Sequence, residues 1–324
     1  MTLPETPRRI FMLGATGTIG RATVQVLVQR GHHVTCFLRR RSEDPGLNGV
    51  ELRYGDLLDP ASIRSEGFHG ESFDTVLSCL ASRNGSKADA WAIDHRAHSN
   101  VLQEAQTAGV SQMILLSAIC VQKPLLPFQQ AKLAFEAELQ ASGLCWSIIR
   151  PTAFFKSLSG QIKRVQSGRP YLLFGDGALT ACKPLSDRDL AEFLADCLTN
   201  SNRHNKVLPI GGPGPALTPR QQGDILFEVL GKKPKFRKVP VALMDAIIGA
   251  LSLLGRMSPK LARKAELARI GRYYATESML LLNAETNQYD ADATPETGKD
   301  TLREHFEAIT AGDVAVDLGD HAVF

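Results

Sequence analysis

Short runs of β-branched and other apolar residues alternate with longer amphipathic stretches through the first half of the chain. This alternation is typical of βαβ units, in which helical crossovers join parallel strands. The predicted strands are 9–13, 33–38, 50–54, 75–79, 112–116 and 145–149, and the predicted helices are 18–30, 88–108 and 125–141. Six strands joined in this way predict an α/β fold with a Rossmann-type doubly wound parallel sheet.

The pattern changes after Pro151, where glycine-rich turns divide the chain into shorter elements. A helix at 186–198 and a strand at 207–210 are expected to return to the main sheet. We therefore predict an NADP(H)-binding domain made of residues 8–155 and 185–212. Residues 156–184 and 213–324 are predicted to form a smaller, mainly helical C-terminal substrate-binding or cap region.

The composition is that of a soluble globular protein, with 44% apolar residues, 22% charged residues and a net charge of +3. The sequence contains no basic stripe interleaved with aromatic residues, so it gives no indication of nucleic-acid binding. The six cysteines lack the close spacing of a zinc site, so we expect no metal site and predict reduced, mostly buried thiols. The N-terminal residues are unlike a signal peptide or a transit segment, which favours a bacterial cytoplasmic location.

A glycine-rich turn follows the first predicted strand and opens the first predicted helix. Glycines there let backbone amides approach a pyrophosphate, which the partial positive charge of the helix N-terminus also attracts. The alternative is a tight turn without a ligand. We favour a dinucleotide site, and its predicted contact residues are Gly14, Thr16, Gly17, Thr18, Ile19 and Gly20.

Three arginines, Arg39, Arg40 and Arg41, follow the second predicted strand. An NAD-specific site places an acidic residue in this region, whereas the 2′-phosphate of NADP needs a cation. Because the planar guanidinium suits a phosphate, Arg39 and Arg40 favour NADPH over NADH. The alternative is a solvated basic loop that contacts no ligand.

Asp56 and Leu57 follow the third predicted strand. The short acidic side chain of Asp56 could accept a hydrogen bond from the adenine amino group. Capping of the turn before Pro60 is an equally good interpretation.

The catalytic tyrosine of short-chain reductases is missing. Those enzymes carry a serine on the fifth strand and a Tyr-x-x-x-Lys pair on the next helix; here Ser117 and Lys132 are present, but Phe128 takes the place of the tyrosine. A phenyl ring cannot transfer a proton. Lys132 could hold the nicotinamide ribose or aid proton transfer, or it could be an exposed helix lysine. The pattern favours reduction of a C=C bond, or cofactor binding without chemistry.

Several long and unusual strings make the chain resemble the divinyl chlorophyllide a 8-vinyl reductase family, an atypical branch of the short-chain dehydrogenases/reductases. These strings are 78–83, 115–126, 150–158, 174–177, 182–184, 208–214 and 270–279, and the likeness extends from the glycine turn to about residue 302. The resemblance implies that NADPH reduces the 8-vinyl group of 3,8-divinyl chlorophyllide a to ethyl, in chlorophyll and bacteriochlorophyll synthesis. Hydride would pass from nicotinamide C4 to the vinyl terminus, and Lys132, Ser117 or a water would then supply a proton.

The run after the sixth predicted strand should lie beside the nicotinamide, where its backbone could pair with the carboxamide. The predicted cofactor contacts beyond the glycine turn are Arg39, Arg40, Asp56, Leu57, Cys79, Leu80, Ala81, Lys132, Pro151, Thr152, Ala153 and Phe154.

A flat, largely apolar macrocycle with a propionate needs an apolar cleft and a cation. The predicted substrate contacts are Phe155, Lys156, Lys183 and Arg272. Phe154 or Phe155 could stack on the ring or simply pack in the core, and each cation could be an ordinary surface charge. His95 or His98 could ligate the magnesium that the substrate carries, but without a third ligand we favour a solvated helix.

The amphipathic stretch 240–254 could cover this cleft or make a peripheral contact with a photosynthetic membrane, but we favour an ordinary buried helix. Two other functions stay open at this point. They are a non-catalytic NADP(H)-sensing regulator and an enone reductase similar to isoflavone reductases.

Overall fold

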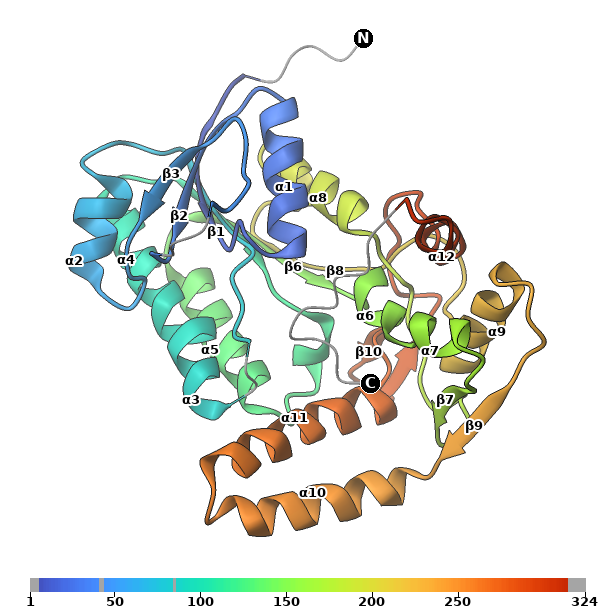
Figure 1. Ribbon diagram of the computed structural model, residues 1–324. Coiled ribbons are helices and arrows are strands. Elements are labelled where there is room, and N and C mark those ends of the chain that lie inside the picture. The colour runs from blue at the N-terminus through green and yellow to red at the C-terminus, as the bar shows by residue number, and fades with distance from the viewer. Residues whose placement is uncertain (1–5, 41–43, 84–85, 314–324) are drawn as a thin grey trace. The chain divides into compact units, whose positions relative to one another are not determined.

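Seven strands form the central sheet of the computed structural model, which describes residues 6–40, 44–83 and 86–313 (Figure 1). The strands are β1 (Arg9–Leu13), β2 (His33–Leu38), β3 (Glu51–Tyr54), β4 (Thr75–Ser78), β5 (Gln112–Leu116), β6 (Cys145–Pro151) and β8 (Lys206–Ile210). Their order is β3-β2-β1-β4-β5-β6-β8, and every neighbouring pair from β3 to β6 is parallel. The predicted doubly wound sheet is confirmed, and the order in which the strands are added reverses between β1 and β4.

The chain divides into two compact units. Unit 1 comprises residues 1–82, 87–151 and 187–208, and unit 2 comprises residues 83–86, 152–186 and 209–324. The boundaries at residues 151, 187 and 208 lie two to four residues from the predicted ones, whereas the inclusion of residues 83–86 in unit 2 was not predicted. The roles assigned to the two domains stay a prediction.

Helices cover both faces of the sheet in unit 1 (Figure 1). On one face, α1 (Thr18–Gln29) packs against α8 (Asp187–Asp196), and Arg30 at the end of α1 forms ion pairs with Glu192 and Asp196 of α8. The other helical segments of unit 1 are α2 (Pro60–Ser62), α3 (Lys87–Ala90), α4 (His98–Thr107), α5 (Pro127–Ala141) and two 3₁₀ turns at Ile119–Gln122 and Ser201–Arg203.

The single helix predicted at 88–108 is interrupted in the structure. Between α3 and α4 the segment Trp91–Ala97 is π-helical, as is a second segment, Ile63–Phe68. The hydrophobic period of a sequence predicts a helix, but it does not show where the backbone widens to i→i+5 hydrogen bonds.

The core of unit 1 follows from burial of the sheet on both faces. Residues 10–13 of β1 are completely buried, as expected for a central strand of a parallel sheet. Beside this strand, Phe11 stacks on Phe68 with 4.5 Å between ring centroids. Four of the six cysteines are buried, in agreement with the prediction of mostly buried thiols.

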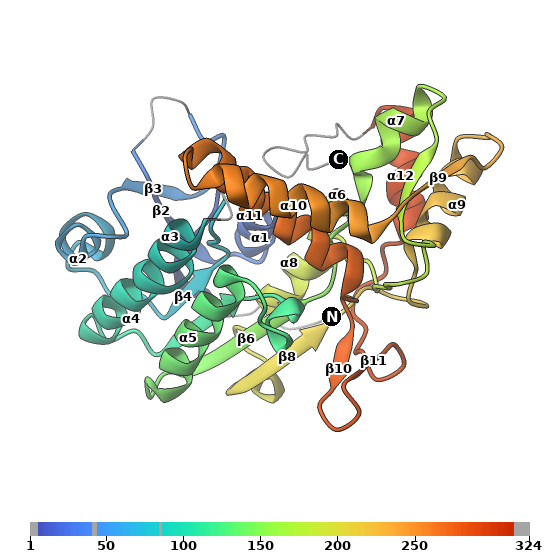
Figure 2. The same ribbon diagram turned by 90° about the horizontal axis from the view of Figure 1, so that it is seen from below.

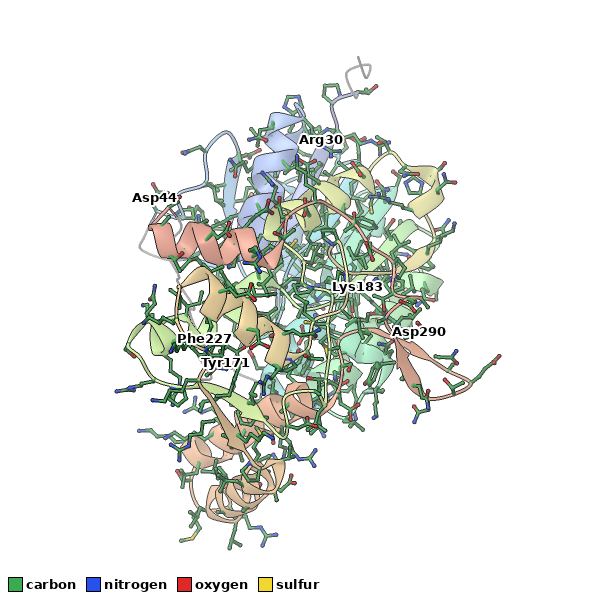
Figure 3. All side chains as sticks on the ribbon, turned by 90° about the vertical axis from the view of Figure 1, so that its right-hand side faces the viewer. Arg30, Asp44, Tyr171, Lys183, Phe227 and Asp290 are labelled. Atoms are coloured by element: carbon green, nitrogen blue, oxygen red, sulfur yellow. The ribbon has the colours of Figure 1, made fainter. Side chains whose placement is uncertain are left out.

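Unit 2 has two small sheets and six α-helices within the described residues. One sheet is the parallel pair β7 (Tyr171–Phe174) and β9 (Phe236–Val239), and the other is the antiparallel pair β10 (Leu281–Asn283) and β11 (Gln288–Asp290). The helices are α6 (Phe155–Leu158), α7 (Ile162–Gln166), α9 (Pro219–Val229), α10 (Val241–Gly255), α11 (Pro259–Thr276) and α12 (Leu302–Ala311), and a 3₁₀ turn spans Ser159–Gln161. Tyr171 and Phe227, both labelled in Figure 3, belong to the apolar core of this unit.

Helix α10 differs from the sequence-based expectation. We favoured an ordinary buried helix at 240–254, but none of the residues of α10 is buried. It forms a hairpin with α11, and Figures 1 and 2 both show the two helices side by side. The composition of α10 is that of a core helix, so its hydrophobicity did not reveal its exposure.

Candidate functional site

The carboxyl ends of the parallel strands in unit 1 bring most of the predicted site residues to one edge of the sheet. The glycine turn follows β1, the arginines follow β2, Cys79 follows β4 and Ser117 follows β5. In a doubly wound sheet, ligands bind at this edge beside the position where the strand order reverses.

The three glycines of the turn differ in what an added side chain would meet. A Cβ on Gly14, whose φ is +74°, would lie 2.5 Å from the carbonyl carbon of Cys79, and one on Gly20 would lie 2.1 Å from the carbonyl oxygen of Gly14. Both glycines are therefore required by the packing of the chain. A Cβ on Gly17 would meet only the Gly14 oxygen, at an ordinary 3.5 Å. The open space at Gly17 fits the close approach of a pyrophosphate.

The first turn of α1 also fits an anion. Gly17 is the N-cap residue and makes no side-chain capping bond, and the first turn holds no acidic residue. The backbone N–H groups of this turn thus keep their partial positive charge for a bound phosphate.

Arg39 and Arg40 are exposed directly after β2, and Arg41 lies outside the described residues. Arg40 forms an ion pair with Glu66, yet 73% of its side chain stays exposed. A hydrogen bond from Ser62 and the charge of Arg40 lower the pKa of Glu66. Arg40 is therefore positioned by a carboxylate and remains accessible to a phosphate.

Asp56 closes a local turn. Its Oδ1 accepts a hydrogen bond from the Leu58 N–H at 2.9 Å, as the alternative of a capped turn before Pro60 proposed. Asp59 is the N-cap of the helix that follows this turn. Leu57 is buried in the core of unit 1, which accounts for its side chain without a ligand.

The segment after β4 is held against the glycine turn. The Cys79 N–H donates to the Leu13 carbonyl at 3.0 Å, and the Leu80 N–H lies 3.3 Å from the Ser78 hydroxyl. Burial raises the pKa of the Cys79 thiol to about 12, so this thiol stays protonated and unreactive. Ala81 is exposed at the same edge.

Lys132 is buried and ion-paired, which contradicts the alternative of an exposed helix lysine. Its Nζ lies 3.0 Å from Oδ1 of Asp94, and the Asp94 side chain is completely buried. Asp94 also accepts hydrogen bonds from the backbone and the hydroxyl of Ser82, at 3.2 and 2.5 Å. Phe128 lies one helical turn before Lys132 on the same face of α5.

Ser117 also has a buried partner that sequence reasoning missed. Its hydroxyl donates to Glu136, one helical turn after Lys132, and the Arg150 guanidinium donates to the same carboxylate. Glu136 is 1% exposed. The i+4 spacing of residues 128, 132 and 136 was the available signal, because it places all three on one helix face.

The two helical histidines are not both solvated, as had been favoured. His98 is buried, lies 2.8 Å from the Ser78 hydroxyl and 2.9 Å from the Ile93 carbonyl, and burial lowers its pKa to about 4. His95 lies 2.7 Å from Glu138. No group of three or more possible metal-ligating side chains occurs among the described residues.

The run after β6 is already hydrogen-bonded within unit 2. The Thr152 N–H donates to the Ile210 carbonyl at 2.9 Å, and the Ala153 carbonyl accepts from the Leu185 N–H at 2.9 Å. The Phe154 carbonyl accepts from the Ser157 N–H at 3.0 Å. These bonds occupy several backbone groups that we expected to be available for a nicotinamide carboxamide.

The predicted substrate residues have different surroundings. Phe155 packs in the core of unit 2, as its alternative interpretation proposed. Lys183 (Figure 3) is 5% exposed and lies 2.6 Å from Glu296, so it is not a surface charge. Arg272 forms an ion pair with Asp245 and thereby joins α11 to α10. Lys156 is partly exposed.

Comparison with known proteins identifies the family. The family described as NAD(P)H-binding matches residues 14–201. The divinyl chlorophyllide a 8-vinyl-reductase of Zea mays is 47% identical over 338 residues, covering 99% of this chain and 84% of the relative, and that of Cucumis sativus is 49% identical over 333 residues, covering 97% and 79%. The chain belongs to the divinyl chlorophyllide a 8-vinyl-reductase family.

The fold of this family member is shared with distant reductases. The NADPH-dependent quinone oxidoreductase QOR2 of Escherichia coli, solved in complex with NADPH, superposes with a TM-score of 0.68 at 18% sequence identity. The superposition covers 93% of this chain and 99% of the QOR2 chain. A likeness at this level of identity concerns the fold.

The predicted bacterial cytoplasmic location is wrong, because the similar members of the divinyl chlorophyllide a 8-vinyl-reductase family are named chloroplastic. Reduced cysteines are found in more than one compartment, so they could not decide the question. Within the described residues, no helix combines the length and the hydrophobicity needed to cross a bilayer.

Proposed function

We propose that this protein uses NADPH to reduce the 8-vinyl group of 3,8-divinyl chlorophyllide a to ethyl, in chlorophyll synthesis. The observation that carries the proposal is 45–49% identity, over nearly the whole chain, with four proteins named for that activity. The replacement of the catalytic tyrosine by Phe128 supports it, since a C=C bond conjugated to a macrocycle does not need a phenolic acid.

NADPH fits the residues of unit 1. The space at Gly17 and the uncapped start of α1 suit the pyrophosphate, and Arg39 and Arg40 suit the 2′-phosphate. When bound, the nicotinamide would supply the hydride. Unit 1 is accordingly proposed as the cofactor domain and unit 2 as the substrate domain.

We assign the proton donor to Lys132. The Ser117 hydroxyl already donates its single proton to Glu136, whereas an ammonium has three protons and Lys132 uses one toward Asp94. Asp94 holds the ammonium in place, and Phe128 beside it can neither give nor take a proton. Among the predicted catalytic residues, Lys132 therefore has a proton to give at the inner vinyl carbon.

For the substrate, we propose contacts with Phe154 and Lys156. Both are partly exposed, whereas Phe155 and Lys183 are buried. A macrocycle could stack on the Phe154 ring while its propionate approaches Lys156. Replacement of Lys156 by Met should raise KM for the pigment and leave NADPH affinity unchanged.

The reaction is tested by mixing purified protein, NADPH and divinyl chlorophyllide and following the Soret band, which should move to shorter wavelength. An unchanged spectrum with intact NADPH binding would instead favour a non-catalytic NADP(H) sensor. NADPH oxidation with small conjugated enones, but not with pigment, would favour an enone reductase.

The role of Lys132 is tested with Lys132→Arg, which keeps the charge beside Asp94 but holds its proton too tightly to donate it. We expect turnover to fall by about 100-fold or more while NADPH affinity changes by less than about threefold. Equal losses in turnover and NADPH affinity would restrict Lys132 to cofactor binding.

The photosynthetic membrane is proposed as a peripheral partner of the protein. The exposed apolar helix α10 supports this contact.

A further inference from the structure

The helical hairpin α10–α11 has an exposed apolar tip. Around the connection between the two helices, Leu253, Leu254 and Met257 are 63, 51 and 89% exposed. Two further residues of α10, Leu243 and Ile247, are 50 and 47% exposed. Apolar side chains grouped in this way mark an interaction surface rather than scattered surface residues.

The hairpin and the segment before it carry a large excess of positive over negative charge. Residues 232–272 contain eleven Lys or Arg and two Asp or Glu, a net charge of +9 in a chain whose net charge is +3. The rest of the chain is therefore acidic, with a net charge of −6. The small overall charge conceals this separation.

The two acidic residues of this segment are both used inside the hairpin. Asp245 pairs with Arg272, and Glu266 lies 2.5 Å from Arg269. Four exposed cations then surround the apolar tip, and none of them has an acidic partner within 4 Å among the described residues. They are Arg256, Lys260, Arg263 and Lys264.

We propose that this hairpin tip, defined as residues 253–264, binds the surface of an anionic lipid bilayer. The proposal deepens the peripheral membrane contact proposed above and needs neither the cofactor nor the reductase reaction. Leu253, Leu254 and Met257 enter the interface between headgroups and acyl chains, while the four cations contact the headgroups. The hairpin lies in the interface, because neither helix has the length and hydrophobicity to span a bilayer.

Charge selects the bilayer over the other candidates for this surface. A second copy of the chain would bring the same cations against each other in a symmetric dimer. A pigment with one propionate would leave most of the four cations unpaired. An anionic bilayer presents both many negative charges and an apolar layer below them.

The experiment uses the full chain, without NADPH or pigment, and vesicles sedimented at low and high salt. Phosphatidylcholine vesicles with 30% phosphatidylglycerol are compared with pure phosphatidylcholine vesicles. Each basic residue near an anionic surface strengthens binding about fivefold. The reversal of Arg256, Lys260, Arg263 and Lys264 to Glu should therefore weaken binding to the anionic vesicles by at least about 100-fold.

The matched control reverses four exposed cations elsewhere, Arg96, Lys163, Arg169 and Lys206. It gives the same total charge and should keep most of the vesicle binding. Replacement of Leu253, Leu254 and Met257 by Ser should weaken binding without removing its salt dependence.

Equal binding of the wild type to both kinds of vesicle, equal loss in the tip and control variants, or self-association through the tip in place of vesicle binding would each overturn the proposal. NADPH binding and circular dichroism check that the variants are folded. Reductase turnover in vesicle-free solution should be unchanged in the tip variant, so an inactive wild type that still binds vesicles would refute the proposed reaction and not the membrane site.

Discussion

The glycine turn allows the strictest test of the cofactor site, because its glycines have separable roles. Gly17→Ala adds a Cβ that contacts the rest of the chain only at 3.5 Å, so the fold should accept it. The backbone of Gly17, with φ −75° and ψ 166°, is also accessible to alanine. Loss of a favourable N-cap residue and restriction of the unfolded chain largely cancel, and stability should change by less than about 1 kcal/mol.

Gly20→Ala should behave in the opposite way. Its Cβ would lie 2.1 Å from the Gly14 carbonyl oxygen, which is backbone and cannot rotate away. Relief of such a clash requires a shift of the turn and should cost about 2–3 kcal/mol of folding stability. For a chain of this size, that loss corresponds to a decrease in Tm of roughly 3–5 °C.

NADPH affinity should also distinguish Gly17→Ala from the wild type. In Gly17→Ala the new methyl group occupies the approach of the pyrophosphate, and the loss of even one charge-assisted hydrogen bond, about 1.5 kcal/mol, lowers NADPH affinity at least about tenfold. Calorimetric titration with NADPH and thermal unfolding measure the two effects. Gly160→Ala, where a Cβ meets no atom within 4 Å, is the control for the substitution itself.

Two results would refute the reasoning. If Gly17→Ala lowered Tm as much as Gly20→Ala, the middle glycine would be structural. If it bound NADPH as tightly as the wild type, the pyrophosphate would lie elsewhere.

Three further predictions concern charge. Replacement of Arg39 and Arg40 by Ser should weaken NADPH binding by about 10- to 100-fold and leave NADH binding nearly unchanged in fluorescence titrations, since each lost contact to the 2′-phosphate is a charge-assisted hydrogen bond. Glu136→Gln should lower the free energy of unfolding in urea by about 2–3 kcal/mol, because it leaves a partly buried guanidinium without its carboxylate; Glu138→Gln, on the same helix, should have a smaller effect. Burial lowers the pKa of His98 to about 4 in the folded state, whereas a histidine in the unfolded chain has a pKa of about 6.5. Between these two values the unfolded chain binds more protons than the folded protein, so the free energy of unfolding should fall by about 3 kcal/mol as pH decreases from above 6.5 to 4. His98→Asn should remove this pH dependence and His305→Asn should remove less of it, and identical pH profiles for wild type and His98→Asn would contradict the assignment.

The strands and the glycine turn could be predicted because local patterns determine them. The alternation of apolar runs located every strand of the main sheet, and the position of Lys132 four residues after Phe128 placed both on one helix face. These are properties of neighbouring residues, which the sequence displays directly.

The partners of the site residues could not be predicted in the same way. Asp94 precedes Lys132 by 38 residues and lies in a π-helical segment that periodicity does not reveal. Lys183 and Glu296 are separated by 113 residues, so nothing in the local sequence indicated that the lysine is buried and paired. Tertiary contacts also reversed the expectations for His98 and α10.

The π-helical segment Trp91–Ala97 limits how the length of this chain can vary. A π-helical turn takes up one residue more than an α-helical turn for nearly the same rotation, so deletion of one residue there would give a regular helix and leave its two ends in register. Insertion of a residue is different, because each further residue of an α-helix adds a rotation of about 100°. Either Asp94 would then turn away from Lys132, or the buried face of α4 would turn away from the sheet. A surface loop tolerates the gain and the loss of a residue alike, whereas this segment should tolerate the loss better than the gain.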